Sequence, residues 1–214
     1  MDKPEIILVG GGGHCKSCID VIETEGRFII KGIIDLPDML GDLTLGYPVI
    51  GNDDDLHKLA KEGYNFLITL GHMGNPKRRK ELFDIIKNNK GYLPVIKSPF
   101  ARISKYSEIG DGTIIMHNCI VNADAKIREN CIINNKALVE HDVLVESNCH
   151  ISTDANINGN CTVFENVFVG SAATLKNGIS IAPNVFIGAG SIVVKSIEKK
   201  GVYFGNPARK IISE

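Results

Sequence analysis

Residues 133–163 read INNKALVEHDVLVESNCHISTDANINGNCTV, with an aliphatic side chain at every sixth position. The same spacing continues in both directions without a change of register. An amphipathic helix repeats every 3.6 residues and a half-buried strand every two, so neither accounts for the pattern. A period of six is typical of a parallel β-helix, in which each unit supplies one short strand and one turn. All sixteen positions are aliphatic: Ile103, Ile109, Ile115, Val121, Ile127, Ile133, Val139, Val145, Ile151, Ile157, Val163, Val169, Leu175, Ile181, Ile187 and Val193.

The position four residues after each aliphatic one is small or apolar almost throughout, as a closely packed corner requires. Four of the six cysteines fall in this series, and we interpret them as small buried hydrophobic residues. Cys15 and Cys18 form a lone CxxC without a second pair to complete a zinc site, so a redox or metal role is the less favoured alternative. The four repeat cysteines are Cys119, Cys131, Cys149 and Cys161.

Residues 1–97 have a different pattern, in which strand-like and helix-like segments alternate. Such alternation predicts a small parallel α/β sheet. We therefore expect two domains: a Rossmann-like α/β domain at residues 1–97 and an all-β domain of hexapeptide repeats at residues 98–214. The expected strands are residues 5–9, 31–34, 66–70 and 92–96, and the expected helices are residues 14–24, 52–62 and 76–88.

The chain of 214 residues is 43% hydrophobic and 23% charged, with a formal net charge of −1. This composition is typical of a soluble globular protein. The near-neutral charge argues against binding to nucleic acid or to a membrane surface. The apolar run near the N-terminus is too short for a signal peptide, and no later run has the length of a transmembrane helix. We therefore expect a cytoplasmic protein.

Four glycines, Gly10 to Gly13, follow the first predicted strand and precede a predicted helix. Glycines let backbone N–H groups approach a phosphate, and the helix N-terminus favours the anion. Asp35 lies 22 residues after Gly13, where a dinucleotide-binding domain carries a ribose-binding acid. An NAD-binding protein is thus the obvious alternative. About 97 residues, however, leave no room for a full doubly wound sheet.

Three segments add to the repeat: VGGGGH at 9–14, VEHDVLVESNCH at 139–150 and GVYFGNPAR at 201–209. Together with the two-part layout, they resemble the hexapeptide-repeat sugar acetyltransferases. That family includes UDP-4-amino-sugar N-acetyltransferases of bacillosamine synthesis, perosamine N-acetyltransferases and sialic acid O-acetyltransferases. The resemblance covers nearly the whole chain. It implies a left-handed parallel β-helix with three faces per coil, acetyl-CoA as co-substrate, and a homotrimer with the active site between subunits.

The resemblance implies catalytic roles for three residues. His141 matches the general base of the family, and Asp142 matches its acidic partner, which is usually a glutamate. His150 matches a second histidine near the acetyl carbonyl, a candidate donor to the developing oxyanion. Imidazole suits the base because it titrates near neutrality and accepts the proton that an attacking amine loses. With three six-residue units per coil, Gly159 would stack on His141 from the next coil and leave an open track for a pantetheine arm.

The resemblance also implies two sets of binding residues. Glycines, a histidine, acids and the 71–79 loop would hold a nucleotide sugar. Small residues along the coils and a C-terminal segment would hold coenzyme A. The first set is Gly12, Gly13, His14, Lys16, Asp35, Asn75, Arg79 and Asn134, and the second is Gly159, Gly170, Ser171, Gly188, Ala189, Lys195, Pro207 and Arg209.

These features predict an acetyl-CoA-dependent N-acetyltransferase that acts, without a metal, on the C4 amino group of a UDP-linked amino-deoxy sugar. O-acetylation of a sialic-acid-like sugar stays open, since His141 would serve both acceptors. Two further alternatives are a non-catalytic nucleotide-sensing scaffold and a zinc enzyme of the carbonic anhydrase type, with ligands among His117, His141 and His150. The acceptor sugar and its nucleotide, whether UDP, dTDP or GDP, stay open as well.

Overall fold

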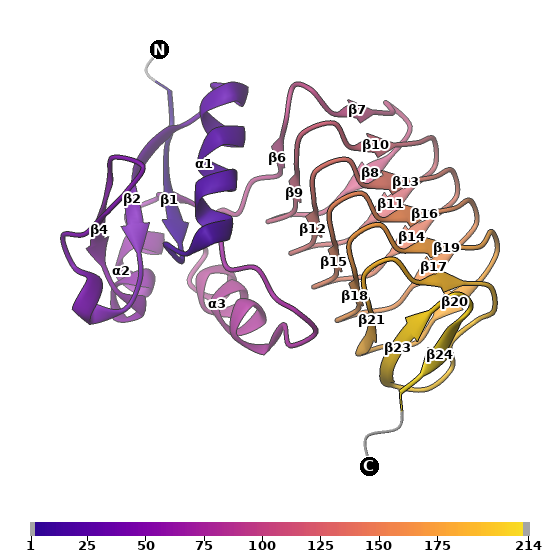
Figure 1. Cartoon of the computed structure of the whole chain (residues 1–214). Helices are drawn as coiled ribbons and strands as arrows, with labels where there is room; N and C mark the ends of the chain where they lie inside the picture. The colour runs from indigo at the N-terminus through magenta and orange to yellow at the C-terminus, as the bar shows by residue number, and fades with distance from the viewer. Residues whose placement is uncertain (1–2, 212–214) are drawn as a thin grey trace.

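The computed structural model describes residues 3–211, which form two parts joined near residue 96 (Figure 1). The N-terminal part contains a five-stranded sheet with strand order β3-β4-β2-β1-β5. Its strand pairs are parallel except for β3 with β4. The strands are β1 (Glu5–Val9), β2 (Ile29–Ile34), β3 (Leu43–Thr44), β4 (Tyr47–Gly51) and β5 (Asn65–Ile68); the helices are α1 (Gly13–Glu25), α2 (Leu56–Lys61) and α3 (Lys77–Asn88), with 3₁₀ turns at Pro37–Met39 and Asp53–Asp55.

Alternate residues of β1 face opposite sides of this sheet, and different helices cover the two sides. Ile6 and Leu8 share a core with α1, whereas Ile7 and Val9 share a core with α2 and α3. Burial on both faces explains why β1 is an unbroken apolar run. The turn from β1 to α1 and the carboxyl ends of β2 and β5 meet at one edge of the sheet, where α/β folds bind ligands.

The predicted alternation of strands and helices is confirmed, with two differences. The segment at 92–96 is not a strand of this sheet: Tyr92 makes one bridge to Asn65, and β6 (Ile96–Lys97) pairs with β9 of the second part. The sequence pattern misses β4, whose Pro48 is atypical of an inner strand. The exact domain division at residues 97 and 98 stays a prediction.

The C-terminal part is a parallel β-helix with three faces. Each strand pairs with the third strand after it in the sequence, as in Ile132 with His150, so one coil contains three six-residue units. The first face is the eight-stranded sheet of β6 (Ile96–Lys97), β9 (Ile114–Ile115), β12 (Ile132–Ile133), β15 (His150–Ile151), β18 (Phe168–Val169), β21 (Val185–Ile187), β23 (Gly201–Gly205) and β24 (Ala208–Lys210). The second is the six-stranded sheet of β7 (Arg102–Ile103), β10 (Ile120–Val121), β13 (Leu138–Val139), β16 (Asn156–Ile157), β19 (Thr174–Leu175) and β22 (Ile192–Val193). The third is the five-stranded sheet of β8 (Glu108–Ile109), β11 (Lys126–Ile127), β14 (Leu144–Val145), β17 (Thr162–Val163) and β20 (Ser180–Ile181).

The aliphatic series of the sequence forms the core of the β-helix. Fourteen of its sixteen members are buried, and Ile103 and Ile109, in the first coil, are partly buried. All six cysteines are free and buried, which confirms the interpretation of the repeat cysteines. Burial also raises the pKa of the Cys15 thiol to about 11, so the CxxC pair offers no reactive thiolate near neutral pH.

The corners of the coil explain why the repeats are rich in asparagine and aspartate. Each turn places one residue in the left-handed region of backbone space, where short polar side chains and glycine are favoured. Two corners are used below by name. The Asn134 corner lies between the first and second faces, and the His141 corner lies between the second and third. Left-handed residues with φ between 58° and 62° are Asn118, Asp124, Asn130, Asp142, Asn148, Asp154, Asn160, Asn166 and Asn184.

The N-terminal part packs against the first face of the β-helix (Figure 1). Ile114 and Ile132, which lie on this face outside the core series, are fully buried. The His141 corner is opposite this face, so it stays clear of the N-terminal part of the same chain. Within residues 3–211, no helix has the length and apolarity needed to cross a membrane.

Candidate active site

His141 follows β13 and projects from the corner that bears its name. Its Nδ1 lies 2.7 Å from Oδ2 of Asp142, and its side chain is 58% exposed. The hydrogen bond to Asp142 raises the pKa of His141 above its ordinary value, and the charge of Glu140 adds to the effect. Since a carboxylate only accepts, Nδ1 carries the hydrogen in this pair, and Nε2 is the basic nitrogen when the ring is neutral.

Gly159 lies one coil below His141, as predicted from the stacking of successive coils. A Cβ atom at this position would stand 2.7 Å from both Cε1 and Nε2 of the His141 ring. Any side chain there would displace the imidazole. Glycine is therefore required here for the imidazole to lie directly against the backbone of the next coil.

The residues assigned to coenzyme A divide between two corners. Gly159 and Lys195 belong to the His141 corner, since they lie one and three whole coils below His141. Lys195, Pro207 and Arg209 line one cavity of about 620 Å³ at the C-terminal end of this corner. The structure thus places His141, Gly159 and a cavity with basic residues along one edge of the β-helix.

The other four residues of that set lie on the Asn134 corner. Gly170 and Gly188 continue a column that begins at Asn134 and Ser152, again at steps of one coil. A side chain at Gly188 would collide with the ring of Phe204, so packing of the C-terminal hairpin by itself requires this glycine. Beside the column, Oγ of Ser171 lies 3.0 Å from Oγ of Ser152, and Ala189 is exposed one coil further on.

The glycine-rich turn before α1 has the geometry of an anion site. Gly12 and Gly13 are exposed, and a Cβ on either would meet nothing within 4 Å. No acidic residue occupies the first turn of this 13-residue helix, and the Lys16 side chain is exposed on it. Asp35 braces the turn: its Oδ2 accepts a hydrogen bond from the Gly11 N–H at 2.6 Å.

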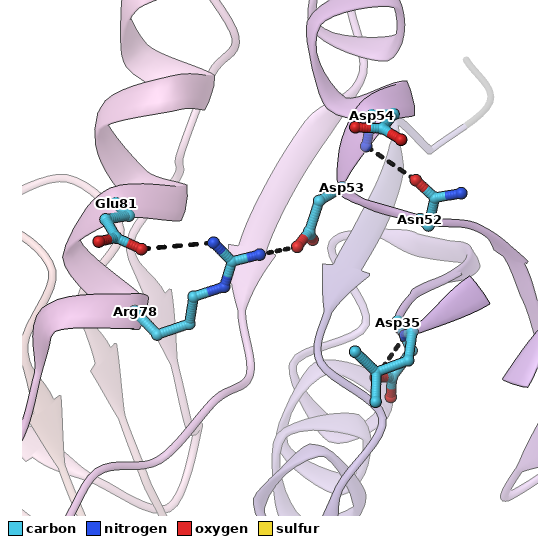
Figure 2. Close-up of polar contacts among 7 residues, drawn as sticks. Asp35, Asn52, Asp53, Asp54, Arg78 and Glu81 are labelled. Atoms are coloured by element: carbon cyan, nitrogen blue, oxygen red, sulfur yellow. Dashed lines mark hydrogen bonds and ion pairs between the residues drawn. The ribbon is translucent and has the colours of Figure 1, made fainter. Parts of the chain in front are cut away.

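Asp35 also lines a cavity of about 240 Å³ at the same edge of the sheet. Leu36, Leu70 and Leu82 supply apolar walls, and an ion pair between Arg78 and Asp53 crosses the rim. Figure 2 shows Arg78 held between Asp53 and Glu81, with the Glu81 oxygen at 3.3 Å. The predicted site residues did not include Arg78 or Asp53, because only the fold brings the segment after β4 beside α3.

Three histidines from distant parts of the chain form a cluster in which His72 and His150 are buried and His14 is half-buried. The ring centroids of His72 and His150 are 5.4 Å apart, and those of His14 and His150 are 6.2 Å apart. Burial, with Arg79 nearby, lowers the pKa of His14 to about 3 and that of His150 to about 4. Burial, His150 and Arg79 lower the pKa of His72 to about 3. Near pH 7 all three rings are therefore neutral.

Two polar groups link this cluster to the Asn134 corner. Nδ1 of His150 lies 2.9 Å from the carbonyl oxygen of His72, and its Nε2 lies 3.3 Å from Nδ2 of Asn134. The structure brings Asn134 and His150 together, and their predicted roles at the sugar and at the acetyl carbonyl stay predictions. His72 was not predicted, and its position in the loop directly after β5 is the signal that points to it.

Arg79 has a different place from the one predicted. Its guanidinium is buried and donates hydrogen bonds to the backbone carbonyls of Asn130, Ile68, Leu70 and Gly112. It joins α3 and β5 to the β-helix and is not presented to a substrate. The helical spacing of α3 indicates the burial of Arg79, because this residue lies on the same buried face as Leu82, Phe83 and Ile86.

Asn75 and His117 also stand apart from the nucleotide edge. Asn75 accepts a hydrogen bond from the Lys77 N–H at the start of α3 and lines a cavity that has no residue in common with the Asp35 cavity. His117 has both ring nitrogens engaged, by Ser98 at 2.6 Å and Asp20 at 2.9 Å. Across residues 3–211, no group of three His, Cys, Asp or Glu gathers as a metal site. Because both ring nitrogens of His117 are engaged, this residue is not available as a ligand in the three-histidine zinc alternative.

Two protein families match the sequence: the PglD N-terminal domain at residues 5–86 and the bacterial transferase hexapeptide (six repeats) at residues 101–141. Among solved structures, the acetyltransferase domain of PglB from Neisseria gonorrhoeae in complex with acetyl coenzyme A has 27% identity and a TM-score of 0.91, covering 98% of this chain and 100% of that chain. PerB from Caulobacter crescentus, in complex with CoA and GDP-perosamine, has 28% identity and a TM-score of 0.89, covering 97% of each chain. WeeI from Acinetobacter baumannii has 22% identity and a TM-score of 0.87 over 98% of this chain and 100% of that chain, which shows a shared fold. No curated protein sequence matches.

The fold and the repeats define a hexapeptide-repeat acyltransferase with a left-handed parallel β-helix. The chain has the domain order of the sugar acetyltransferases PglB and PerB, a PglD-type α/β domain followed by hexapeptide repeats, and is similar to both over nearly its whole length. The fold class and the family predicted from the sequence are confirmed. The NAD-binding and scaffold alternatives are both set aside by this assignment.

Proposed function

We propose that the protein transfers the acetyl group of acetyl-CoA to the C4 amino group of a UDP-linked amino-deoxy sugar. The relatives with bound ligands support the two substrate classes, since one holds acetyl coenzyme A and another holds CoA with GDP-perosamine. The observation that carries the proposal is the exposed His141–Asp142 pair, whose hydrogen bond leaves Nε2 as the basic nitrogen of a ring that lies against Gly159. Such a pair suits a general base in amide formation.

In the proposed reaction the lone pair of the sugar amine attacks the thioester carbonyl carbon. His141 Nε2 takes the proton that the nitrogen loses as the C–N bond forms. The C–S bond then breaks, and coenzyme A leaves as a thiolate that receives the proton from the imidazolium. Asp142 holds the ring in the tautomer that exposes Nε2 and stabilises its charged form. All six cysteines are buried, so a direct transfer fits better than a cysteine acyl-enzyme.

The nucleotide would bind at the sheet edge formed by Gly12, Gly13, His14 and Asp35. Its diphosphate would meet the N-terminus of α1 and Lys16, and its base the cavity lined by Asp35. Asn134 would then contact the sugar end. This arrangement leaves the amine on the first-face side of the chain, whereas His141 lies on the opposite corner.

A homotrimer resolves this separation. The second face, which divides the two corners, is six residues wide and spans at most about 20 Å. A pantetheine arm that follows the His141 corner of one subunit would meet Asn134, Gly170 and Gly188 on a second copy of the chain. We therefore propose that the active site lies between subunits, with coenzyme A held by both corners.

The test is an acetyl-transfer assay with acetyl-CoA and a panel of UDP-, dTDP- and GDP-linked 4-amino sugars. We expect turnover of a UDP-linked amine and a loss of about 10²–10⁴-fold in kcat for His141→Asn. His57→Asn, at an exposed position of α2, is the matched control. Turnover only with free or CMP-linked nonulosonates would replace the proposal with the O-acetyltransferase alternative. Full activity of His141→Asn would remove the proposed base.

A further inference from the structure

Three hydrogen bonds form a chain from the N-terminal part into the Asn134 corner. The His72 carbonyl oxygen lies 2.9 Å from Nδ1 of His150. Nε2 of the same ring lies 3.3 Å from Nδ2 of Asn134. Oδ1 of Asn134 lies 2.8 Å from the backbone nitrogen of Asn135. The chain thus joins the loop after β5 to two successive coils of the β-helix.

The direction of each hydrogen bond follows from the chemistry of its two ends. A carbonyl oxygen only accepts, so Nδ1 of His150 carries a hydrogen. The ring is neutral because burial and Arg79 lower the pKa of His150, and its Nε2 therefore bears a lone pair. The Asn135 N–H only donates, so it fixes Oδ1 of Asn134 toward itself and turns Nδ2 toward His150. The amide donates and the imidazole accepts.

The surroundings of His150 favour this neutral form. The titratable and charged groups that face it are His14 from α1, His72 from the loop after β5 and Arg79 from α3. Phe168 of β18 covers another side, with ring centroids 5.2 Å apart. Burial removes water from the imidazole and the nearby Arg79 repels a positive charge, so both disfavour the charged ring.

One hydrogen of the Asn134 amide is engaged by His150, and the other has no partner within residues 3–211. Asn134 is half-buried at the head of the column that continues through Ser152 and Gly170. We propose that this second N–H donates to the thioester carbonyl oxygen and stabilises the oxyanion formed when the amine attacks. His150 is then a positioning residue that fixes the Asn134 amide. This role rests on the proposed acetyl transfer and replaces the sequence-based expectation that His150 itself donates.

The level of Asn134 along the β-helix fits this role. Asn134 and His141 lie in one coil, little more than one six-residue unit apart. This separation corresponds to a rise of about 2 Å for a coil spacing of about 4.8 Å. In a trimer whose axis runs along the β-helices, the two residues keep that small difference in level between neighbouring subunits. The donor and the base then reach one thioester from opposite sides.

The first test needs no substrate. Nitrogen-15 NMR of the full-length protein, labelled at histidine, reports which ring nitrogen bears hydrogen, and the spectrum of His150→Gln assigns the His150 signals. We expect a protonated Nδ1 and a bare Nε2 for His150 at neutral pH. A hydrogen on Nε2, in the neutral or the charged ring, would overturn the proposal because His150 could then donate directly.

The second test compares substitutions that keep or remove each hydrogen bond. Asn134→Asp keeps the acceptor for Asn135 but cannot donate, so we expect kcat to fall about 10²–10³-fold. His150→Gln offers a donor to the His72 carbonyl and an acceptor to Asn134, so it should retain activity within about tenfold and leave the pH profile of kcat unchanged. His150→Ala should lose most of the activity. Asn89→Asp, at the exposed end of α3, is the matched control.

Each outcome bears on the proposal. Asn134→Asp with a kcat within about threefold of the parent would overturn it, as would a folded His150→Gln that is as inactive as His150→Ala. Circular dichroism shows which variants fold, and the NMR test decides the hydrogen-bond direction if they do not. Absence of acetyl transfer by the parent enzyme to any amino sugar would remove the proposed function, whereas the tautomer result would still stand.

Discussion

His141 and His150 are close together in the sequence and have opposite chemistry. The His141 side chain is 58% exposed, and its hydrogen bond to Asp142 raises its pKa. His150 is 7% exposed, and burial lowers its pKa to about 4. The same type of side chain thus binds a proton more readily at His141 and is held neutral at His150. Position in the coil decides this, because one corner faces solvent and the first face is covered by the N-terminal part.

The largest expected effect is a loss of folding stability at acidic pH, which comes from the histidine cluster and not from the exposed His141. The rings of His14, His72 and His150 have lowered pKa values, so between pH 6.5 and about 4 the unfolded chain binds more protons than the folded one. Stability is therefore present at neutral pH and lost as the pH falls. From pH 7 to pH 5 the free energy of unfolding should drop by about 2 kcal/mol for each ring that stays neutral. Urea unfolding at both pH values measures this, and equal stabilities would contradict the neutral cluster.

The next prediction concerns Arg79, the cation beside the histidine cluster. Arg79→Leu leaves four buried carbonyls without their donor, so we expect the free energy of unfolding to fall by about 3 kcal/mol. It also removes a nearby positive charge that holds the pKa values of the cluster down. Arg78→Leu, at the exposed neighbouring position, should change stability far less. Equal unfolding midpoints for the two variants would contradict the role of Arg79 as a buried link.

Displacing the His141 ring by a substitution at Gly159 should leave the fold and the proposed nucleotide site intact. The side chain of Gly159→Val would displace the His141 ring, and we expect kcat to fall about 10²-fold. The affinity for the nucleotide sugar should stay within about twofold, because the proposed site for that ligand lies in the N-terminal part. Steady-state kinetics with titration calorimetry measures both quantities. A parallel loss of nucleotide binding would indicate a wider disruption.

The smallest effect is expected for substitution of Asp142, the hydrogen-bond partner of His141. Asp142 has a φ of 58°, a region that asparagine also tolerates, so Asp142→Asn preserves the turn but removes the charge. The pKa of His141 should then fall toward its ordinary value. Because the neutral ring is the base, the rise of kcat with pH should move to lower pH, with a loss of about tenfold on the plateau. Asp142→Glu should keep the parent midpoint, and an unshifted Asp142→Asn profile would contradict the pairing.

Most of the fold follows from local periodicity. An aliphatic residue at every sixth position indicates a parallel β-helix, and the structure buries this series along its axis; the three faces per coil were implied by the family resemblance. The stacking of Gly159 on His141 follows from the same arithmetic. Residues on the sheet edge were also foreseeable, because Gly12, Gly13 and Asp35 directly follow predicted strands.

Contacts between the two parts were not foreseeable in the same way. Nothing in the loop at 71–76 indicates that His72 turns its carbonyl toward a ring 78 residues away. Arg79 stands among charged neighbours in KRRK and reads as part of a solvated face, yet docking of α3 on the β-helix buries it. Asn75 accepts a hydrogen bond from the Lys77 N–H just before α3 and lies away from the nucleotide edge.

The sequence by itself determined the coil, its inward series, its left-handed corners and the stacking of residues one coil apart, since each depends only on neighbours within one repeat or one coil. Tertiary structure decided which histidine is charged easily and which is held neutral. It also decided which arginine is buried and on which corner each cofactor residue lies. These properties depend on solvent exposure and on partners from distant segments, which a local pattern does not encode.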